Sequence, residues 1–261
     1  DAAGAAIAAG AGIPVLIVDN PRALLGTLSA WVYGTGTGSD TLSGRALAAA
    51  SKDLPPMPLL FGTTGTNGKT SVSHLLEGIL QQVGAVTGLS STAERHIGDQ
   101  IVVSRLTTPE ASEMHALLAL MRERGVEAVA VEVSAQALSR HRVDGIVFDV
   151  AGFTNLSHDH LDDYADMREY FEAKAPLFQP DRARRGVVSL DTAAGHEIVA
   201  GAGIPIVTVG TPAIAQDATA AAAADWVVTI GDEVQAYTEF TLSGPDGRSL
   251  TTRVPVIGPL M

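Results

Sequence analysis

Residues 61–71 read FGTTGTNGKTS and place glycines, a lysine and hydroxyl side chains in the order of a phosphate-binding loop. Glycine lets the backbone approach an anion, amide groups at a helix N-terminus attract it, and Lys69 adds positive charge. Thr63 stands where the usual Walker pattern has its first glycine, so the loop is a variant. The helix expected after it has four apolar residues on one side, Leu75, Leu76, Ile79 and Leu80. We predict a nucleotide-phosphate site; the alternative is a glycine-rich turn that only joins a strand to a helix.

Glu132 lies near the end of an apolar, β-branched run at residues 126–133. A carboxylate at the end of a central strand, next to a phosphate loop, is placed to hold Mg²⁺ together with the Thr70 hydroxyl. The alternative is a glutamate that faces solvent where the strand ends.

A second polar cluster follows another apolar run, in residues 153–163. It contains His158, Asp159, His160, Asp162 and Asp163. Imidazole and carboxylate groups this close together suit metal binding or proton transfer. The alternative is an N-cap region rich in Asp and Ser.

Three further groups are ambiguous when only their residue types are considered. Lys174, inside an expected helix, is most simply a solvated surface charge. Thr107 and Thr108 precede a proline and a helix, where a capping role is the simplest reading. The basic run 140–142 is an anion receptor or a surface charge run.

The elements that must position these side chains alternate between strands and helices, which predicts a doubly wound, mostly parallel α/β sheet of P-loop type. Strands are expected at 13–19, 126–133, 146–153, 186–190, 204–209 and 226–230, and helices at 22–33, 69–83, 111–124, 166–178 and 192–200. Residues 234–242 and 249–256, around the turn 243–247, predict an antiparallel hairpin at the sheet edge near the C-terminus. A flexible stretch and a proline-rich one place a domain boundary near residue 55. We therefore expect a partial α/β N-terminal domain at 1–55 and a larger domain at 56–261.

Composition describes a globular protein of 261 residues that is 46% hydrophobic and 18% charged. Its net charge of −12, from 29 acidic and 17 basic residues, disfavours a nucleic-acid partner. The absence of cysteine excludes disulfides and thiolate metal sites. No apolar run approaches the roughly 18 residues of a membrane span, so we expect a cytoplasmic protein with no membrane insertion.

Taken together, six segments resemble the Mur ligases, ATP-dependent amino-acid-adding enzymes of peptidoglycan synthesis. They are TGTNGKTS (64–71), LTTPEA (106–111), EVSAQAL (132–138), HRVDG (141–145), FDVAGFTNLSHDHLD (148–162) and YFEAKAPLF (170–178). Their order and spacing are similar to those of the MurE branch, which adds the third residue of the stem peptide to UDP-N-acetylmuramoyl-L-alanyl-D-glutamate. The resemblance covers residues 58–261, and residues 1–35 resemble the end of the family's N-terminal uridine-nucleotide domain.

The resemblance implies a role for each matching position. ATP phosphates would be held by Gly65, Thr66, Asn67, Gly68, Lys69, Thr70 and Ser71. Two Mg²⁺ ions would be held by Thr70, Glu132, His160 and Lys174. Lys174 matches the lysine that CO₂ converts to a carbamate in this family, which reverses its reading as a surface charge. The catalytic groups would be Lys69, His160 and Lys174, and the muramoyl dipeptide would be bound by Thr107, Thr108, Ser134 and Arg142.

The chemistry implied by the resemblance is carboxylate activation by ATP through an acyl phosphate, followed by attack of an amino acid's amine. The enzyme is expected to be a monomer, and the family's C-terminal amino-acid-binding domain is expected to be absent from this chain. Ala135–Gln136 departs from the Ser-His of many relatives. The string DNPR at residues 19–22 marks diaminopimelate selection in some MurE enzymes, but there it belongs to the C-terminal domain, so no such role is expected here. The alternatives are a sister ligase (another Mur ligase or a folylpolyglutamate-synthase-like enzyme) and a non-catalytic nucleotide-binding relative.

Overall fold

The computed structural model describes residues 17–36, 54–103, 106–159, 162–234 and 237–254, together with Gly10 and Gly12. Its strands form one sheet in the order β11-β10-β9-β8-β7-β6-β1-β5-β2-β3-β4. The strands are β1 (Leu59–Thr64), β2 (Thr87–Ser90), β3 (Glu94–Ile97), β4 (Gln100–Val103), β5 (Ala128–Glu132), β6 (Val150–Phe153), β7 (Gly186–Ser189), β8 (Ile206–Gly210), β9 (Trp226–Val234), β10 (Tyr237–Ser243) and β11 (Ser249–Val254). The α-helices are α2 (Pro21–Tyr33), α4 (Lys69–Gln82), α5 (Ala111–Glu123), α6 (Ala135–Ser139), α7 (Met167–Lys174), α8 (Ala193–Gly201) and α9 (Ala218–Ala222). Two short 3₁₀ turns, η1 (Ala175–Phe178) and η2 (Pro245–Gly247), complete the list.

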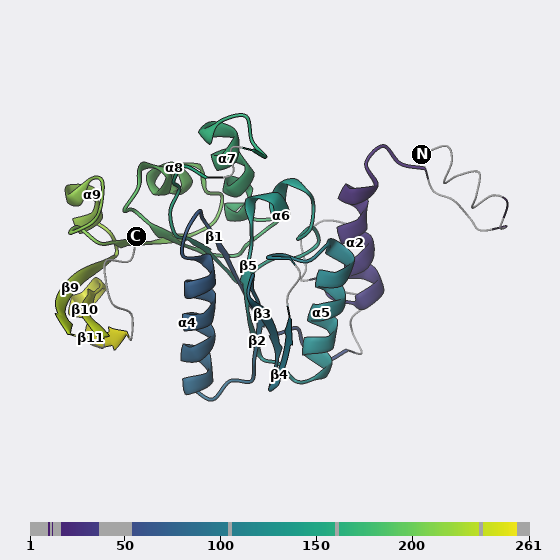
Figure 1. Cartoon of the computed structure of the whole chain (residues 1–261), viewed down its shortest axis with the longest axis horizontal. Helices are drawn as coiled ribbons and strands as arrows, with labels where there is room; N and C mark the ends of the chain where they lie inside the picture. Colours follow the sequence, from purple (N-terminus) through teal and green to yellow (C-terminus); the bar gives the residue numbers. More distant parts are fainter. Residues whose placement is uncertain are drawn as a thin grey trace.

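The sheet is parallel from β2 to β9 in its spatial order and antiparallel at both edges. Strand β1 lies between β5 and β6, so the chain leaves it toward β2 on one side and later continues to β6 on the other. This is a topological switch point, where doubly wound sheets bind ligands beyond the carboxyl ends of their strands. The predicted fold class and the C-terminal antiparallel strands are confirmed. In Figure 1, the loop after β1 lies at the upper edge of the sheet, with α6 and α7 nearby.

The β2–β3–β4 meander is the part of the sheet that the sequence pattern did not predict. Its strands have four residues each, and β3 reads ERHI, so neither length nor alternation marks them. The predicted helix 166–178 divides into α7 and η1, because Pro176 has no backbone N–H to continue an α-helix. The predicted strand 13–19 lies mostly outside the described residues.

Helix α4 buries a polar face and exposes an apolar one, which corrects the expected pattern. Ser73 and Glu77 are its buried residues, whereas Leu75 is 43% and Ile79 62% exposed. Glu77 tolerates burial because its carboxylate accepts hydrogen bonds from the His96 ring and the Thr87 hydroxyl. These hydrogen bonds therefore let Glu77 lie on the buried face of α4, and of the four expected apolar residues only Leu76 and Leu80 are half-buried.

Helix α2 packs on α5, on the right of Figure 1. A side chain at Gly26 would collide with Asp144, since its Cβ would lie 2.5 Å from the Asp144 carbonyl oxygen. Arg122 donates to the carbonyls of Tyr33 (3.1 Å) and Gly34 (2.7 Å) and so satisfies the C-terminus of α2. Asn20 of the DNPR string caps the other end through Ala23 N–H. The domain boundary near residue 55 stays a prediction.

Among the described helices, none is both long and apolar enough to cross a bilayer.

Candidate active site

The loop between β1 and α4 has the backbone geometry that its glycines predict. Gly65 has φ 142° and Gly68 φ 85°, both in the positive-φ region where glycine is strongly favoured. Helix α4 starts at Lys69 and has no side-chain N-cap. The amides of its first turn lack intrahelical acceptors and carry the positive end of the helix dipole. The loop therefore presents an open anion site at the carboxyl edge of the sheet.

Residues 154–157, which follow β6 and are distant in sequence, hydrogen-bond to this loop. The Thr66 amide donates to the Asn155 carbonyl (2.9 Å), and the Asn67 amide donates to Asn155 Oδ1 (3.0 Å). Thr154 Oγ1 donates to the Asn67 carbonyl at 2.7 Å. Because two loop amides are used in this way, the amides of residues 68–70 remain to meet an anion. The role of Asn155 is not predictable from residue types, because it depends on a contact between residues 88 apart.

Gly65→Ala should unfold the loop without disturbing the helix behind it. A Cβ at Gly65 would lie 2.0 Å from Thr154 Oγ1, and its φ is unfavourable for alanine. We expect a loss of about 1–3 kcal/mol in the free energy of unfolding, from backbone strain alone, and loss of nucleotide binding. Urea unfolding and titration with ADP measure the two effects.

Gly78→Ala is the matched control, because a Cβ there, inside α4, meets nothing within 4 Å. It should stabilise the protein by about 0.5–1 kcal/mol, since alanine is the better helix former, and should leave ADP binding intact. Equal free energies of unfolding and equal ADP affinities of the two variants would contradict the assigned loop geometry.

Lys69 folds back over the loop that it follows. Its Nζ donates to the carbonyls of Gly65 (3.1 Å) and Thr66 (2.8 Å). Burial lowers the pKa of Lys69, while the negative charges of Glu132 and Asp159 oppose that shift. The ammonium group is thus held in the mouth of the loop by fixed acceptors and nearby carboxylates.

Glu132 is fully buried at the end of β5, and both of its carboxylate oxygens have a donor. Thr92 supplies both, its amide to Oε1 and its hydroxyl to Oε2, each at 3.0 Å. A buried carboxylate needs such hydrogen-bond partners. Glu132 is therefore held in place by Thr92 and is not a glutamate facing solvent. Thr92 was not identified from the sequence, because 40 residues separate it from Glu132.

Thr108 lies beneath the site and is completely buried. Its hydroxyl donates to the Glu132 carbonyl (2.7 Å) and accepts from the Ser134 amide (3.2 Å). The hydroxyl of Ser134 caps α6 by accepting from Ala137 N–H at 3.1 Å. Both side chains thus fix the backbone on either side of the Glu132 position.

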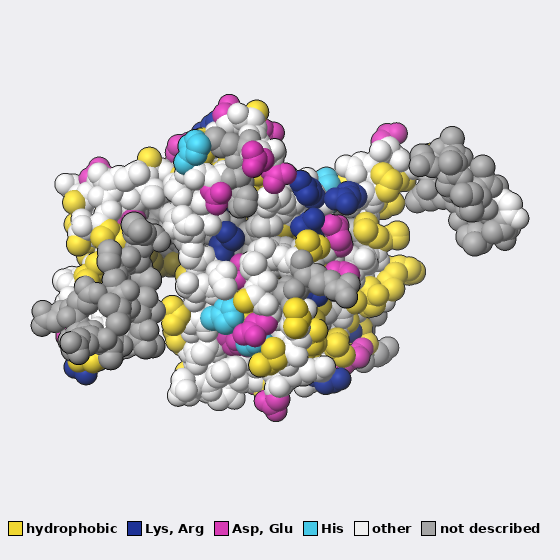
Figure 2. All heavy atoms as spheres, viewed as in Figure 1, with side chains coloured by type: hydrophobic (Ala, Val, Ile, Leu, Met, Phe, Trp, Pro, Cys, Tyr) yellow, Lys and Arg dark blue, Asp and Glu magenta, His cyan; other side chains and the backbone are white. Residues whose placement is uncertain are grey.

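Basic side chains gather beside the cavity, interleaved with carboxylates (Figure 2). Arg142 Nη2 lies 3.0 Å from Glu110, and its Nε is buried without a partner among the described residues. Arg140 pairs with Asp163 at 2.9 Å, and Gln136 donates to the same carboxylate. Arg140 and Arg142 therefore line the cavity, each paired with a carboxylate, and a role of the run 140–142 as an anion receptor stays a prediction.

A cavity of about 590 Å³ joins these groups. This volume lies within the range of small-molecule sites, about 300–1,000 Å³. The described residues that line it are Thr66, Asn67, Gly68, Lys69, Thr70, Thr92, Leu106, Thr107, Glu132, Ser134, Gln136, Arg140, Arg142 and Asp163. Of the predicted site residues, Gly65, Ser71, Thr108 and Lys174 are not among them. His160 lies outside the described residues, so its predicted role stays a prediction.

Lys174, at the end of α7, is only 1% exposed, so the simple reading as a surface charge is wrong. Its Nζ lies 3.8 Å from the centre of the Tyr170 ring, a cation–π distance. Burial lowers the pKa of Lys174 to about 7, with a further lowering by the charge of Lys69 and an opposing effect of Asp159. At neutral pH a large fraction of this amine is therefore unprotonated.

In the described part of the chain, no three His, Cys, Asp or Glu side chains group closely enough to hold a metal ion alone. A Mg²⁺ ion that accompanies a nucleotide does not need such a group, since one or two carboxylates and phosphate oxygens suffice. The buried Glu132 carboxylate and Thr70, which line one cavity, fit that kind of ion.

Comparisons with known proteins identify the family of this chain. The family described as "Mur ligase middle domain" matches residues 63–260. A UDP-N-acetylmuramyl-tripeptide synthetase of Leifsonia xyli subsp. xyli is 55% identical over 99% of this chain and 45% of its own length. A UDP-N-acetylmuramoyl-L-alanyl-D-glutamate–2,6-diaminopimelate ligase of Streptomyces avermitilis is 44% identical over 99% of this chain and 46% of its own. The chain thus spans about half the length of the curated relatives it matches.

Solved structures give the same picture of the fold. The structure of a UDP-N-acetylmuramoyl-L-alanyl-D-glutamate–2,6-diaminopimelate ligase matches with a TM-score of 0.68 and 26% identity, over 82% of this chain and 42% of that one. The FolC protein of E. coli, in complex with DHPP and ADP, matches with a TM-score of 0.54 and 18% identity, over 95% of this chain and 55% of that one. At that identity the second match supports the fold alone.

Proposed function

Because this chain belongs to the Mur ligase family, we propose that it carries the ATP-binding part of an ATP-dependent acid–amino-acid ligase of peptidoglycan synthesis. The complete protein would add the third amino acid to UDP-N-acetylmuramoyl-L-alanyl-D-glutamate. The observation that carries this proposal is a single cavity lined by the phosphate loop, the fixed carboxylate Glu132, and Ser134 and Arg142. A nucleotide and an anionic acceptor need such a shared space if a phosphoryl group is to pass between them.

The nucleotide end of the cavity is formed by the loop and the start of α4. The amides of residues 68–70 and the Lys69 ammonium would receive the β- and γ-phosphates. Thr70 and Glu132, with His160, would hold Mg²⁺, which neutralises charge that develops on the phosphates. In a chain of net charge −12, these local groups must provide the attraction that the overall field does not.

Lys174 would complete a second Mg²⁺ site after conversion to a carbamate. Its neutral amine forms an N–C bond to CO₂ and loses a proton, which turns a buried cation into an anion. A pKa of about 7 favours this, because the attacking form is abundant at neutral pH. The carbamate would supply a carboxylate ligand to a site where the described side chains provide few metal ligands.

Thr107, Ser134 and Arg142 line the same cavity. They would orient the γ-carboxylate of the D-glutamate residue, with Thr108 holding the backbone beneath them. The carboxylate oxygen attacks the γ-phosphorus of ATP, which gives an acyl phosphate and ADP. The amine of the incoming amino acid then attacks the acyl carbon, and phosphate leaves as the amide forms. We propose that the enzyme acts in the cytoplasm as a monomer.

Release of ADP by the complete protein should require ATP, Mg²⁺, the UDP-muramoyl dipeptide and an amino acid together. Diaminopimelate and lysine, assayed separately, identify the added residue through the mass of the UDP-muramoyl tripeptide. A tetrahydrofolate acceptor in place of the dipeptide tests the folylpolyglutamate-synthase-like alternative. ADP release that needs no muramoyl dipeptide, or none in any combination, would contradict the proposal.

A further inference from the structure

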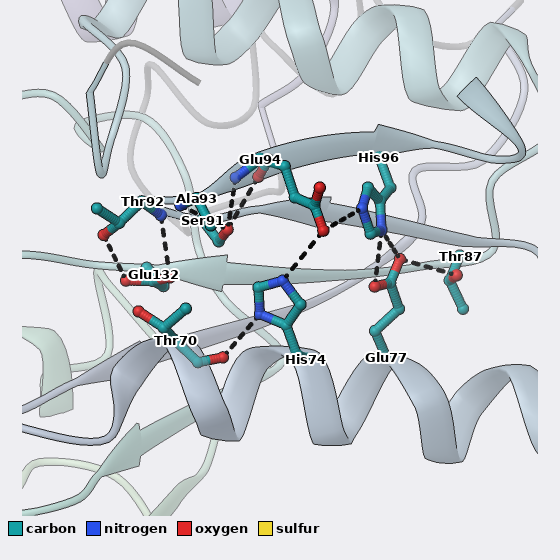
Figure 3. A network of polar contacts seen from close by, with 10 residues as sticks. All are labelled: Thr70, His74, Glu77, Thr87, Ser91, Thr92, Ala93, Glu94, His96 and Glu132. Carbon is teal, nitrogen blue, oxygen red and sulfur yellow. Dashed lines mark hydrogen bonds and ion pairs between the residues drawn. The ribbon is translucent and has the colours of Figure 1, made fainter. Parts of the chain in front are cut away.

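Figure 3 shows polar contacts at Glu132 and at the backbone carbonyl of Thr70, two residues assigned to Mg²⁺, with the backbone of residues 91–94 connecting the two sets of contacts. The network starts at Glu132, whose carboxylate oxygens are both engaged by Thr92. Thr92 Oγ1 also lies 3.0 Å from Thr107 Oγ1. One residue on the β2–β3 turn therefore supplies a donor to each oxygen of the Glu132 carboxylate.

The turn that carries Thr92 is closed by Ser91. The Ser91 amide and hydroxyl donate to the Glu94 carbonyl at 3.1 and 2.9 Å, and Ser91 Oγ accepts from the amides of Ala93 and Glu94. Four contacts within four residues leave Thr92 little freedom to move relative to the turn. Its position then depends on what holds the turn to the rest of the protein.

Pairing of β2 with β5 places the turn beside the strand that carries Glu132, and helix α4 adds a second link through a chain of histidines and carboxylates. His74 Nδ1 faces the Thr70 carbonyl at 2.8 Å, and His74 Nε2 lies 3.6 Å from Glu94 Oε1. His96 lies between Glu94 (3.1 Å) and the buried Glu77 (2.9 Å). The helix that carries Thr70 is thus tied to the turn that orients Glu132.

We propose that Thr92 is a positioning residue of the metal–nucleotide site, and that His74 transmits the position of α4 to it through Glu94. This inference rests on the proposed function, because it takes Glu132 and Thr70 as Mg²⁺ ligands. Groups that orient metal ligands typically contribute about 10- to 100-fold to metal affinity. Neither residue has a role in the chemistry that the family resemblance implies.

The test measures Mn²⁺ binding by electron paramagnetic resonance in the presence of ADP, with the complete protein. Thr92→Val keeps the shape and the amide donor but removes the hydroxyl, and should weaken Mn²⁺ binding about 10-fold. Thr92→Ser restores the hydroxyl and should bind within about two-fold of the wild type. Thr241→Val, in the remote strand β10, removes a threonine hydroxyl elsewhere and should change nothing. Unchanged Mn²⁺ binding in folded Thr92→Val would overturn the inference.

A second pair of variants tests the same inference from the helix side, should Thr92→Val fail to fold. His74→Gln offers a donor near the Nε2 position and can still reach Glu94, whereas His74→Asn reaches only toward the Thr70 carbonyl. If the tie to the turn matters, the asparagine variant loses Mn²⁺ affinity and the glutamine variant retains most of it. Equal affinities would overturn the role of His74.

Glu132→Gln separates failure of the inference from failure of the proposed function. If the wild type binds Mn²⁺–ADP and Glu132→Gln does not, the ligand assignment stands, whatever the Thr92 variants show. If Glu132→Gln binds like the wild type, the metal assignment is wrong and the inference fails with it.

Discussion

Lys174→Met should lower ligase activity by about 100-fold or more, as loss of a preorganised charged group does, and yet stabilise the folded protein at pH 6. The two effects have one cause, which is the burial of an amine that would otherwise be charged. The side chain is 1% exposed, and burial lowers its pKa to about 7. Methionine has a similar length and no charge to desolvate. The substitution therefore raises the free energy of unfolding while it removes the amine that activity requires.

The pH dependence of stability follows from the same shift. Below pH 7 the amine is protonated in the folded and unfolded chains, and the folded chain carries the cost of a buried charge. Between about pH 7 and 10.4 the unfolded chain still binds a proton that the folded chain has lost. The free energy of unfolding of the wild type, relative to Lys174→Met, should therefore rise over this window. Urea unfolding in CO₂-free buffers measures it, and a flat difference would contradict the depressed pKa.

Chemical rescue distinguishes a carbamate from a simple loss of packing. Lys174→Ala leaves space beside Tyr170, so formate or acetate should partly restore activity by supplying the missing carboxylate. Lys174→Met fills that space and should not respond. A fully active Lys174→Ala variant would exclude the carbamate role.

Elements that are defined by one continuous stretch of residues were predictable from the sequence. The glycines and Lys69 define the loop between β1 and α4, and the apolar run before Glu132 gives strand β5 its place in the sheet. The turn 243–247 marks the hairpin of β10 and β11. In each case the conformation that the local residues favour is the one that the whole fold requires.

Features that depend on distant partners were not predictable in this way. Thr92 gains its role only when the β2–β3 turn meets Glu132, and Asn155 only when β6 lies beside β1. The burial of Lys174 likewise appears only in the folded structure, where α7 packs against α6, since its helical position alone predicts solvent. These contacts join residues far apart in the chain, and a single sequence gives no signal for them.

Lys69→Met should slow phosphoryl transfer by about 100- to 1,000-fold in kcat, because the negative charge on the transferred phosphoryl group loses its fixed cation. The Nζ lies within 3.1 Å of two loop carbonyls, so the loop holds the ammonium where phosphate oxygens would arrive. The variant should also bind ADP more weakly, which calorimetry measures directly. Arg253→Met is the matched control: it removes one positive charge from an exposed pair with Glu239 on the remote hairpin. If the loss came from the more negative overall field, both variants would be impaired equally and high salt would restore both. We expect only Lys69→Met to be impaired, at low and high salt alike, because a cation inside the loop acts on the phosphates at contact distance, where salt screens little.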